Sequence, residues 1–111
     1  MTYEEIKSLI SSLASLLNVP FSYFQFEKQT SPPFLVYNFP ENDDFFADNS
    51  NYQGITQLDI YYCSDEKDFA AEMAIEVFLK NNGITYTKDQ SYIDTDAMWQ
   101  TLYSTEVIIN A

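Results

Sequence analysis

The feature that most constrains the fold is the alternation of side-chain character across positions 55–63, with Gln57, Asp59 and Tyr61 between the apolar positions. Leu58, Ile60 and Tyr62 occupy every second position, so they share one face of an extended chain. This pattern predicts a half-buried strand of an antiparallel sheet. The segment 99–109 predicts a second long strand of this kind. Its predicted inner face comprises Thr101, Tyr103, Thr105, Val107 and Ile109.

Residues 3–17 predict an amphipathic helix. Thr2 and Glu5 have the spacing of a capping box, in which each side chain bonds the backbone amide of the other residue. Asn18 and Pro20 end the pattern. The apolar positions that recur at helical spacing are Ile6, Leu9, Ile10, Leu13, Leu16 and Leu17. We expect this side to pack on the sheet, with a membrane or a partner helix as the alternative.

A second helix is predicted from a cap at Ser64 or Asp65 through about Asn81, and Gly83 is expected to stop it. Its mid-length polar side chains form one narrow stripe, because Glu72, Glu76 and Lys80 follow at intervals of four. The rest of the circumference is mostly apolar, and the residues concerned are Phe69, Ala70, Met73, Ala74, Ile75, Val77, Phe78 and Leu79. A helix of this kind is expected to be covered on more than one side.

Three shorter strands complete the expected order of elements. The aromatic-rich segment 21–27 predicts the first strand. Residues 34–39 are apolar on both faces, which predicts a central strand covered on both sides. Residues 84–87 predict a short strand, followed by a polar connection over 88–91. The predicted order is α-β-β-β-α-β-β in a single α+β domain (residues 1–111), with a mainly antiparallel or mixed sheet and both helices on one face.

Residue usage argues against common kinds of catalysis. The chain has no histidine, so Ser-His, Cys-His and His-metal chemistry are unavailable. Cys63 is the one cysteine, and we expect it to behave as a small buried hydrophobe. Gly54 and Gly83 are too few and too far apart for a phosphate-binding loop. We therefore expect no enzyme activity, no catalytic residues, no metal and no cofactor.

Charge restricts the partners. Seventeen acidic residues against five basic ones give a net charge of −12, so we expect no direct binding to nucleic acid or to anionic membranes. No stretch approaches the ~18 consecutive apolar residues that a membrane span requires. The N-terminus is acidic where a secretion signal is basic, which predicts a cytoplasmic product.

The segment 41–52 combines acidic residues with two adjacent phenylalanines, Phe45 and Phe46. Its carboxylates match neither a calcium loop nor a glycosidase pair, because ligand spacing and a cleft are both lacking. The two phenylalanines are expected either to anchor another subunit or to fill a local gap in the core. The first interpretation makes this segment a candidate subunit interface. The candidate residues there are Asp43, Asp44, Phe45, Phe46, Asp48 and Asn49.

Several blocks of the sequence resemble small prophage proteins of Gram-positive bacteria, which belong with the tail-completion (tail-terminator) and head–tail joining proteins of long-tailed phages. The likeness covers nearly the whole chain, and the blocks that carry it are 31–37, 41–49 with Tyr52, 58–61, 67–68 and 99–103. The loop begins Asn42-Asp43-Asp44, where the family pattern has a Ser-Asp-Asn type of sequence.

The resemblance implies a subunit of a homo-oligomeric ring, usually a hexamer, that caps the tail tube and presents a surface to the head. The implied partners are copies of itself, the tail-tube protein and the head–tail connector protein. The implied location is the tail or neck of the virion, after assembly in the cytoplasm of the bacterial host. The second helix and the loop would supply contacts, so Ile75, Phe78 and Leu79 join the interface candidates.

Two other functions fit an acidic binding domain. An acidic inhibitor that mimics DNA would carry carboxylates spaced along one ridge, whereas here they are split among the loop, the start of the second helix and the turn at Asp94 and Asp96. A cytoplasmic adaptor that binds other proteins is the second alternative. The oligomeric mass separates these functions, because a ring of about six subunits is expected only for tail completion.

Overall fold

The computed structural model describes residues 1–40 and 54–109. Its elements, in chain order, are α1 (Tyr3–Leu17), β1 (Phe21–Tyr23), β2 (Phe34–Asn38), β3 (Gly54–Ser64), α3 (Phe69–Asn81), β4 (Thr87–Ile93) and β5 (Met98–Ile109). The predicted class and order of elements are therefore confirmed.

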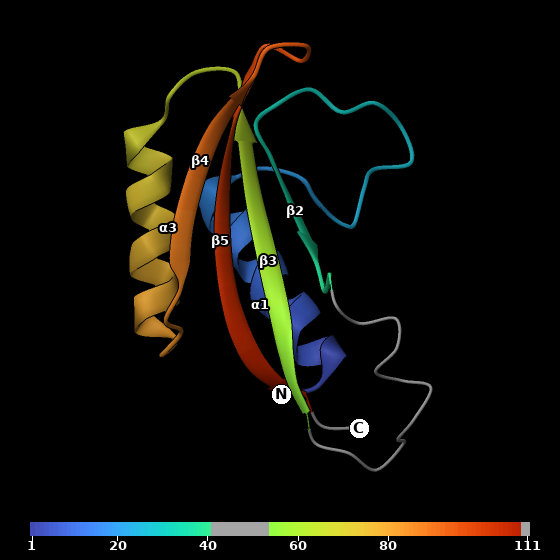
Figure 1. Ribbon diagram of the computed structural model, residues 1–111, viewed down its shortest axis with the longest axis vertical. Coiled ribbons are helices and arrows are strands. Elements are labelled where there is room, and N and C mark those ends of the chain that lie inside the picture. The colour runs from blue at the N-terminus through green and yellow to red at the C-terminus, as the bar shows by residue number, and fades with distance from the viewer. Residues whose placement is uncertain (41–53, 110–111) are drawn as a thin grey trace.

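The strands form one five-stranded mixed sheet in the order β1-β2-β3-β5-β4. β1 pairs with β2 in parallel, and the other neighbours are antiparallel. β3 and β5 are the two strands with the clearest alternation, and they pair over their full length from Gly54↔Ile109 to Ser64↔Trp99. They form the long central pair of Figure 1.

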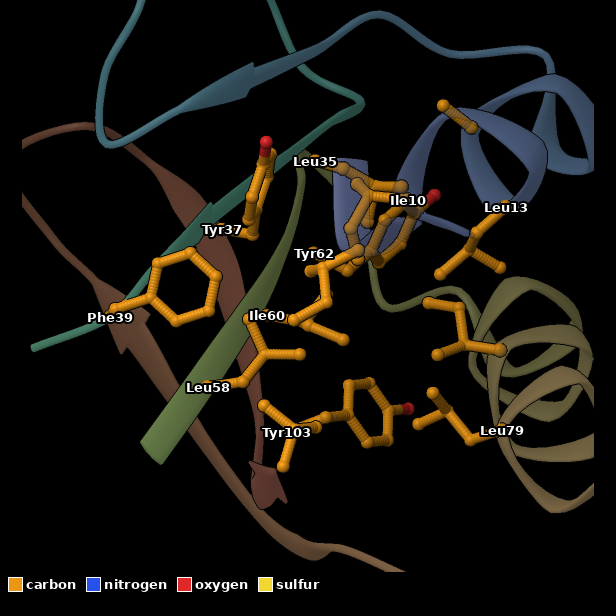
Figure 2. Packing of buried hydrophobic residues seen from close by; sticks show 14 of the residues in the cluster. Ile10, Leu13, Leu35, Tyr37, Phe39, Leu58, Ile60, Tyr62, Leu79 and Tyr103 are labelled. Atoms are coloured by element: carbon orange, nitrogen blue, oxygen red, sulfur yellow. The ribbon is translucent and has the colours of Figure 1, made fainter. Parts of the chain in front are cut away.

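Both helices pack against the same face of the sheet, as the sequence predicted. Figure 2 shows Ile10 and Leu13 of α1, and Leu79 of α3, converging on strand residues such as Ile60 and Tyr103. The predicted inner face of β5 is confirmed, because all five of its residues are buried. We call the opposite side of the sheet, on which neither α1 nor α3 packs, the open face.

α1 has the predicted bounds and caps, but Leu16 of its predicted apolar row is 61% exposed and does not pack on the sheet. The Glu5 amide donates to Thr2 Oγ1 at 3.1 Å, and the Thr2 amide donates to Glu5 Oε1 at 2.9 Å, which completes the capping box. Asn18 ends the helix in the left-handed conformation, with φ 57°. A short polar side chain tolerates this conformation better than a branched one does.

The N-cap of α3 lies three to four residues later than the cap predicted at Ser64 or Asp65. Asp68 is the N-cap, and its Oδ1 accepts a hydrogen bond from the Ala71 amide at 3.0 Å. Ser64 is instead the last residue of β3. The predicted stop at Gly83 is confirmed: its φ is 70°, and the amide that follows, Ile84 N, donates to Leu79 O at 2.9 Å.

Two of the short strands have boundaries that differ from the prediction. β1 ends at Tyr23, because Phe24 adopts a positive φ of 67° that leaves the extended conformation. The last short strand occupies 87–93, so the predicted polar connection over 88–91 is itself the strand. Polar residues in this segment predict a loop, but Lys88 and Gln90 bond from β4 to carboxylates of α3.

The prediction that β2 is covered on both faces is wrong. Leu35 and Tyr37 are buried under the helices, but Phe34 and Val36 on the open face are only partly buried. The segment 24–30 lies over part of this face, where Phe26 packs edge-to-face on Phe34 with ring centroids 5.2 Å apart. On this second face a loop covers only part of β2.

Candidate interaction surface on α3

The sheet-facing side of α3 belongs to the core of the subunit. Ile75 and Leu79 have 0% and 1% of their surface exposed, and Phe78 packs against the same cluster. These three residues were predicted to contact another subunit. Ile75 and Leu79 are buried and stabilise the fold of a single chain, whereas Phe78 is only partly buried, so a contact made by α3 needs further residues on another side of the helix.

Beside these residues, the polar stripe of α3 also faces the sheet. Glu72 is buried, and its carboxylate receives Lys67 Nζ at 2.9 Å and Lys88 Nζ at 2.8 Å. Gln90 Nε2 donates a further hydrogen bond to it at 3.2 Å. Burial by itself would raise the pKa of Glu72, but the hydrogen bonds from Lys88, Lys67 and Gln90 outweigh it and hold that pKa below its usual value.

Glu76 extends this network by one helical turn. Its Oε2 accepts Lys88 Nζ at 2.8 Å and the hydroxyl of Tyr103 at 2.9 Å. Burial and the bond to Glu76 raise the pKa of Tyr103, and the pairing with Glu72 and Glu76 raises the pKa of Lys88. The charged groups of the network are thus used to attach α3 to β4 and β5.

The outward side of α3 carries a row of exposed apolar residues that no other described residue covers. Phe69, Met73 and Val77 are 71%, 67% and 50% exposed. They follow at intervals of four, so they form one row about 12 Å long on the helix surface. We call these three residues the α3 stripe. Beside it lies a depression of about 590 Å³, whose lining combines apolar residues such as Met73, Val77 and Ile84 with the charged side chains of Glu76 and Lys80.

Aromatic residues of the sheet extend the α3 stripe at its N-terminal end. The Lys67 ammonium lies 4.6 Å from the centre of the Phe69 ring and 5.9 Å from that of Trp99. Trp99 in turn packs edge-to-face on Tyr92, with ring centroids 5.3 Å apart, and Tyr92 is 47% exposed. The apolar surface therefore continues from the helix onto β4 and β5.

A second partly apolar surface lies on the open face. A groove of about 540 Å³ runs between the segment 24–30 and strands β2, β3 and β5, and Phe34, Val36 and Met98 contribute to its lining. We call it the open-face groove. At its rim, Phe24 holds a positive φ while its side chain is 62% exposed. A bulky residue rarely adopts this conformation. The side chain of Phe24 remains largely exposed, so burial does not explain why Phe24 adopts it.

Cys63 also lines the open-face groove, but it is 3% exposed. Burial and the nearby Asp96 raise the pKa of its thiol to about 11. The prediction that this cysteine is a buried hydrophobe is confirmed.

The other predicted interface residues, Asp43, Asp44, Phe45, Phe46, Asp48 and Asn49, lie outside the described residues. The residues that the sequence analysis missed are those of the α3 stripe. Their regular spacing was visible, but the helix carries two apolar rows, and the sequence does not tell which row meets the sheet. The polar neighbours of Glu72 decide this, and they come from distant positions on β4.

Within residues 1–40 and 54–109, no helix is long and apolar enough to cross a membrane, and no group of three or more acidic or cysteine side chains is placed to hold a metal ion. In comparisons with known proteins, no family model and no curated protein matched the chain.

Proposed function

We propose that this protein is a structural subunit that associates with copies of itself through the α3 stripe. The observation that carries this proposal is the uncovered row of Phe69, Met73 and Val77. Following the resemblance of its sequence, we further propose that the assembly is a tail-completion or head–tail joining ring of a long-tailed phage. Such a ring would cap the tail tube and join it to the head.

The energetics of α3 support a subunit contact. Burying a large apolar side chain contributes roughly 1.5–3 kcal/mol, and the stripe offers three such side chains in one row. Adjacent exposed apolar residues rimmed by polar ones are typical of protein–protein contact sites. A helix with one side in the core and another side apolar and uncovered has the surface expected of a subunit that is completed by assembly.

The charge of the chain supports a ring through which DNA passes without binding. Lys67 and Lys88 are already paired with Glu72 and Glu76. Within the described residues this leaves Lys7, Lys28 and Lys80 without an ion pair. Three scattered cations cannot provide the row of phosphate contacts on which nucleic-acid affinity depends, and the excess of carboxylates repels the phosphate backbone.

Sedimentation velocity of the purified protein tests the self-association. The wild type is expected to form an oligomer of defined mass, and Met73→Glu is expected to sediment as a folded monomer. Leu16→Glu is the matched control, because Leu16 is an apolar residue of α1 with a similar exposed fraction of 61%. A wild type that stays monomeric at high concentration, or equal behaviour of the two variants, would contradict the proposal.

Two further measurements test the ring and its relation to DNA. Electron microscopy of the oligomer is expected to show closed rings, whereas filaments or compact dimers would contradict tail completion. Fluorescence anisotropy with duplex DNA at low salt, where electrostatic attraction is least screened, is expected to show no binding. Binding under that condition would overturn the interpretation of the acidic surface and would favour a nucleic-acid-related function.

A further inference from the structure

We infer that the α3 stripe of one subunit binds in the open-face groove of the next, so that subunits join head to tail. This inference rests on the proposed self-association and names the second half of the contact. A closed ring needs two different surfaces on each subunit, because every interface pairs one surface with the other. Two exposed surfaces of the described residues suit these roles: the apolar α3 stripe and the partly apolar open-face groove.

The positions of the two surfaces suit a head-to-tail contact. α3 packs on the helix-bearing side of the sheet beside β4, whereas the groove lies on the open face over β2 and β3. Figure 1 shows α3 at one side of the molecule and the loop that follows β1 at the other side. A subunit can therefore offer its stripe to one neighbour and its groove to another neighbour at the same time.

The size and lining of the groove match the stripe. A volume of about 540 Å³ is large enough for two or three large side chains, and the stripe presents three in a row. Phe34, Val36 and Met98 give the groove apolar walls. Phe24 stands at the rim with an exposed ring, where a neighbouring subunit would bury it.

Charge favours this pairing over contact between two identical surfaces. Asp65 and Glu66 are exposed and directly precede α3, so stripe against stripe would bring four carboxylates together. The groove lining contains one carboxylate, Glu27, and one lysine, Lys28, which forms no ion pair within the described residues. Stripe against groove would therefore bring together fewer carboxylates than stripe against stripe, and it would add Lys28 as a cation near Asp65 and Glu66.

Two complementary variants test the arrangement. The stripe variant, Met73→Glu with Val77→Glu, keeps its groove, and the groove variant, Phe24→Asp with Lys28→Glu, keeps its stripe. All four positions are exposed, and aspartate adopts positive φ more readily than phenylalanine, so both variants are expected to fold. Circular dichroism checks folding, and Phe24→Asn serves as a milder groove variant that adds no charge.

Each variant alone is expected to sediment as a monomer, and an equimolar mixture is expected to form a one-to-one dimer and nothing larger. The dimer forms because one intact groove meets one intact stripe, and the remaining ends are blocked. A wild-type oligomer whose variants stay monomeric when mixed, or a groove variant that assembles normally, would overturn the head-to-tail contact and leave the proposed function standing. A monomeric wild type would overturn both.

Discussion

The two helices of this protein pack on the same sheet by different means. α1 turns Ile6, Ile10 and Leu13 inward, where each has 0% of its surface exposed. α3 contributes Ile75 and Leu79 to the same core, but it also turns Glu72 and Glu76 toward β4 and β5 and presents its stripe outward. α1 therefore uses its apolar side for the core, whereas α3 packs on the sheet and also keeps an exposed apolar row.

This difference shows under which condition the apolar row of a helix can be expected to face the core. It does so where the sheet surface beneath the helix is apolar, as it is for α1. β4 carries Lys88 and Gln90 on its inner face, so carboxylates are the complementary side chains on α3. A buried carboxylate is tolerated there because cations and hydrogen-bond donors surround it.

Removing a core side chain of α1 is expected to have the largest effect on stability. Ile10→Ala leaves a cavity in the main cluster, and we expect the free energy of unfolding to fall by about 3 kcal/mol. Urea denaturation of the monomer measures this loss. A fall below about 1 kcal/mol would mean that α1 is less firmly packed than the structure indicates.

Breaking the polar network of α3 is expected to have the next largest effect. Glu72→Gln removes the charge that pairs with two lysines, and we expect a loss of roughly 2 kcal/mol, less than for a fully buried pair because both lysines are partly exposed. Glu4→Gln on the exposed side of α1 is the control, with an expected loss within about 0.5 kcal/mol. Equal losses would show that the network contributes no more than an exposed carboxylate.

The stability difference between wild type and Glu72→Gln is also expected to depend on pH. The pKa of Glu72 is lower in the folded chain than its ordinary value of 4.5, so its contribution to stability is complete above that value. It is lost as the pH falls through the lowered pKa of the folded chain. The difference in unfolding free energy between wild type and Glu72→Gln is expected to be constant near neutral pH and to shrink in acid. A difference that grows in acid would contradict this assignment.

Changes on the outward side of α3 are expected to have the smallest effect on the isolated subunit. Val77→Glu and Leu16→Glu both alter exposed side chains, so each should change the unfolding free energy of the monomer by no more than about 0.5 kcal/mol. Thermal or urea unfolding at low protein concentration provides the comparison. A large loss for Val77→Glu alone would place the stripe in the core of the subunit.

The sequence predicts those parts of the molecule in which apolar residues meet apolar residues. The alternation in β3 and β5 and the periodicity of α1 gave the correct elements and faces. The prediction failed where polar groups are satisfied by distant partners, as in β4, and where one residue leaves its expected conformation, as at Phe24. The start of α3 was missed because Ser64, Asp65 and Asp68 are all residue types that can serve as an N-cap.

Thiol labelling at matched positions on the two helices tests most directly whether the outward side of α3 is covered by another copy. Met73→Cys and Leu16→Cys place a reactive thiol at sites that are 67% and 61% exposed, and the buried Cys63 contributes little signal. At low protein concentration both sites are expected to label at similar rates. At concentrations where the protein assembles, labelling at position 73 is expected to slow strongly while labelling at position 16 continues. Equal rates at both positions in the assembled protein would contradict the account.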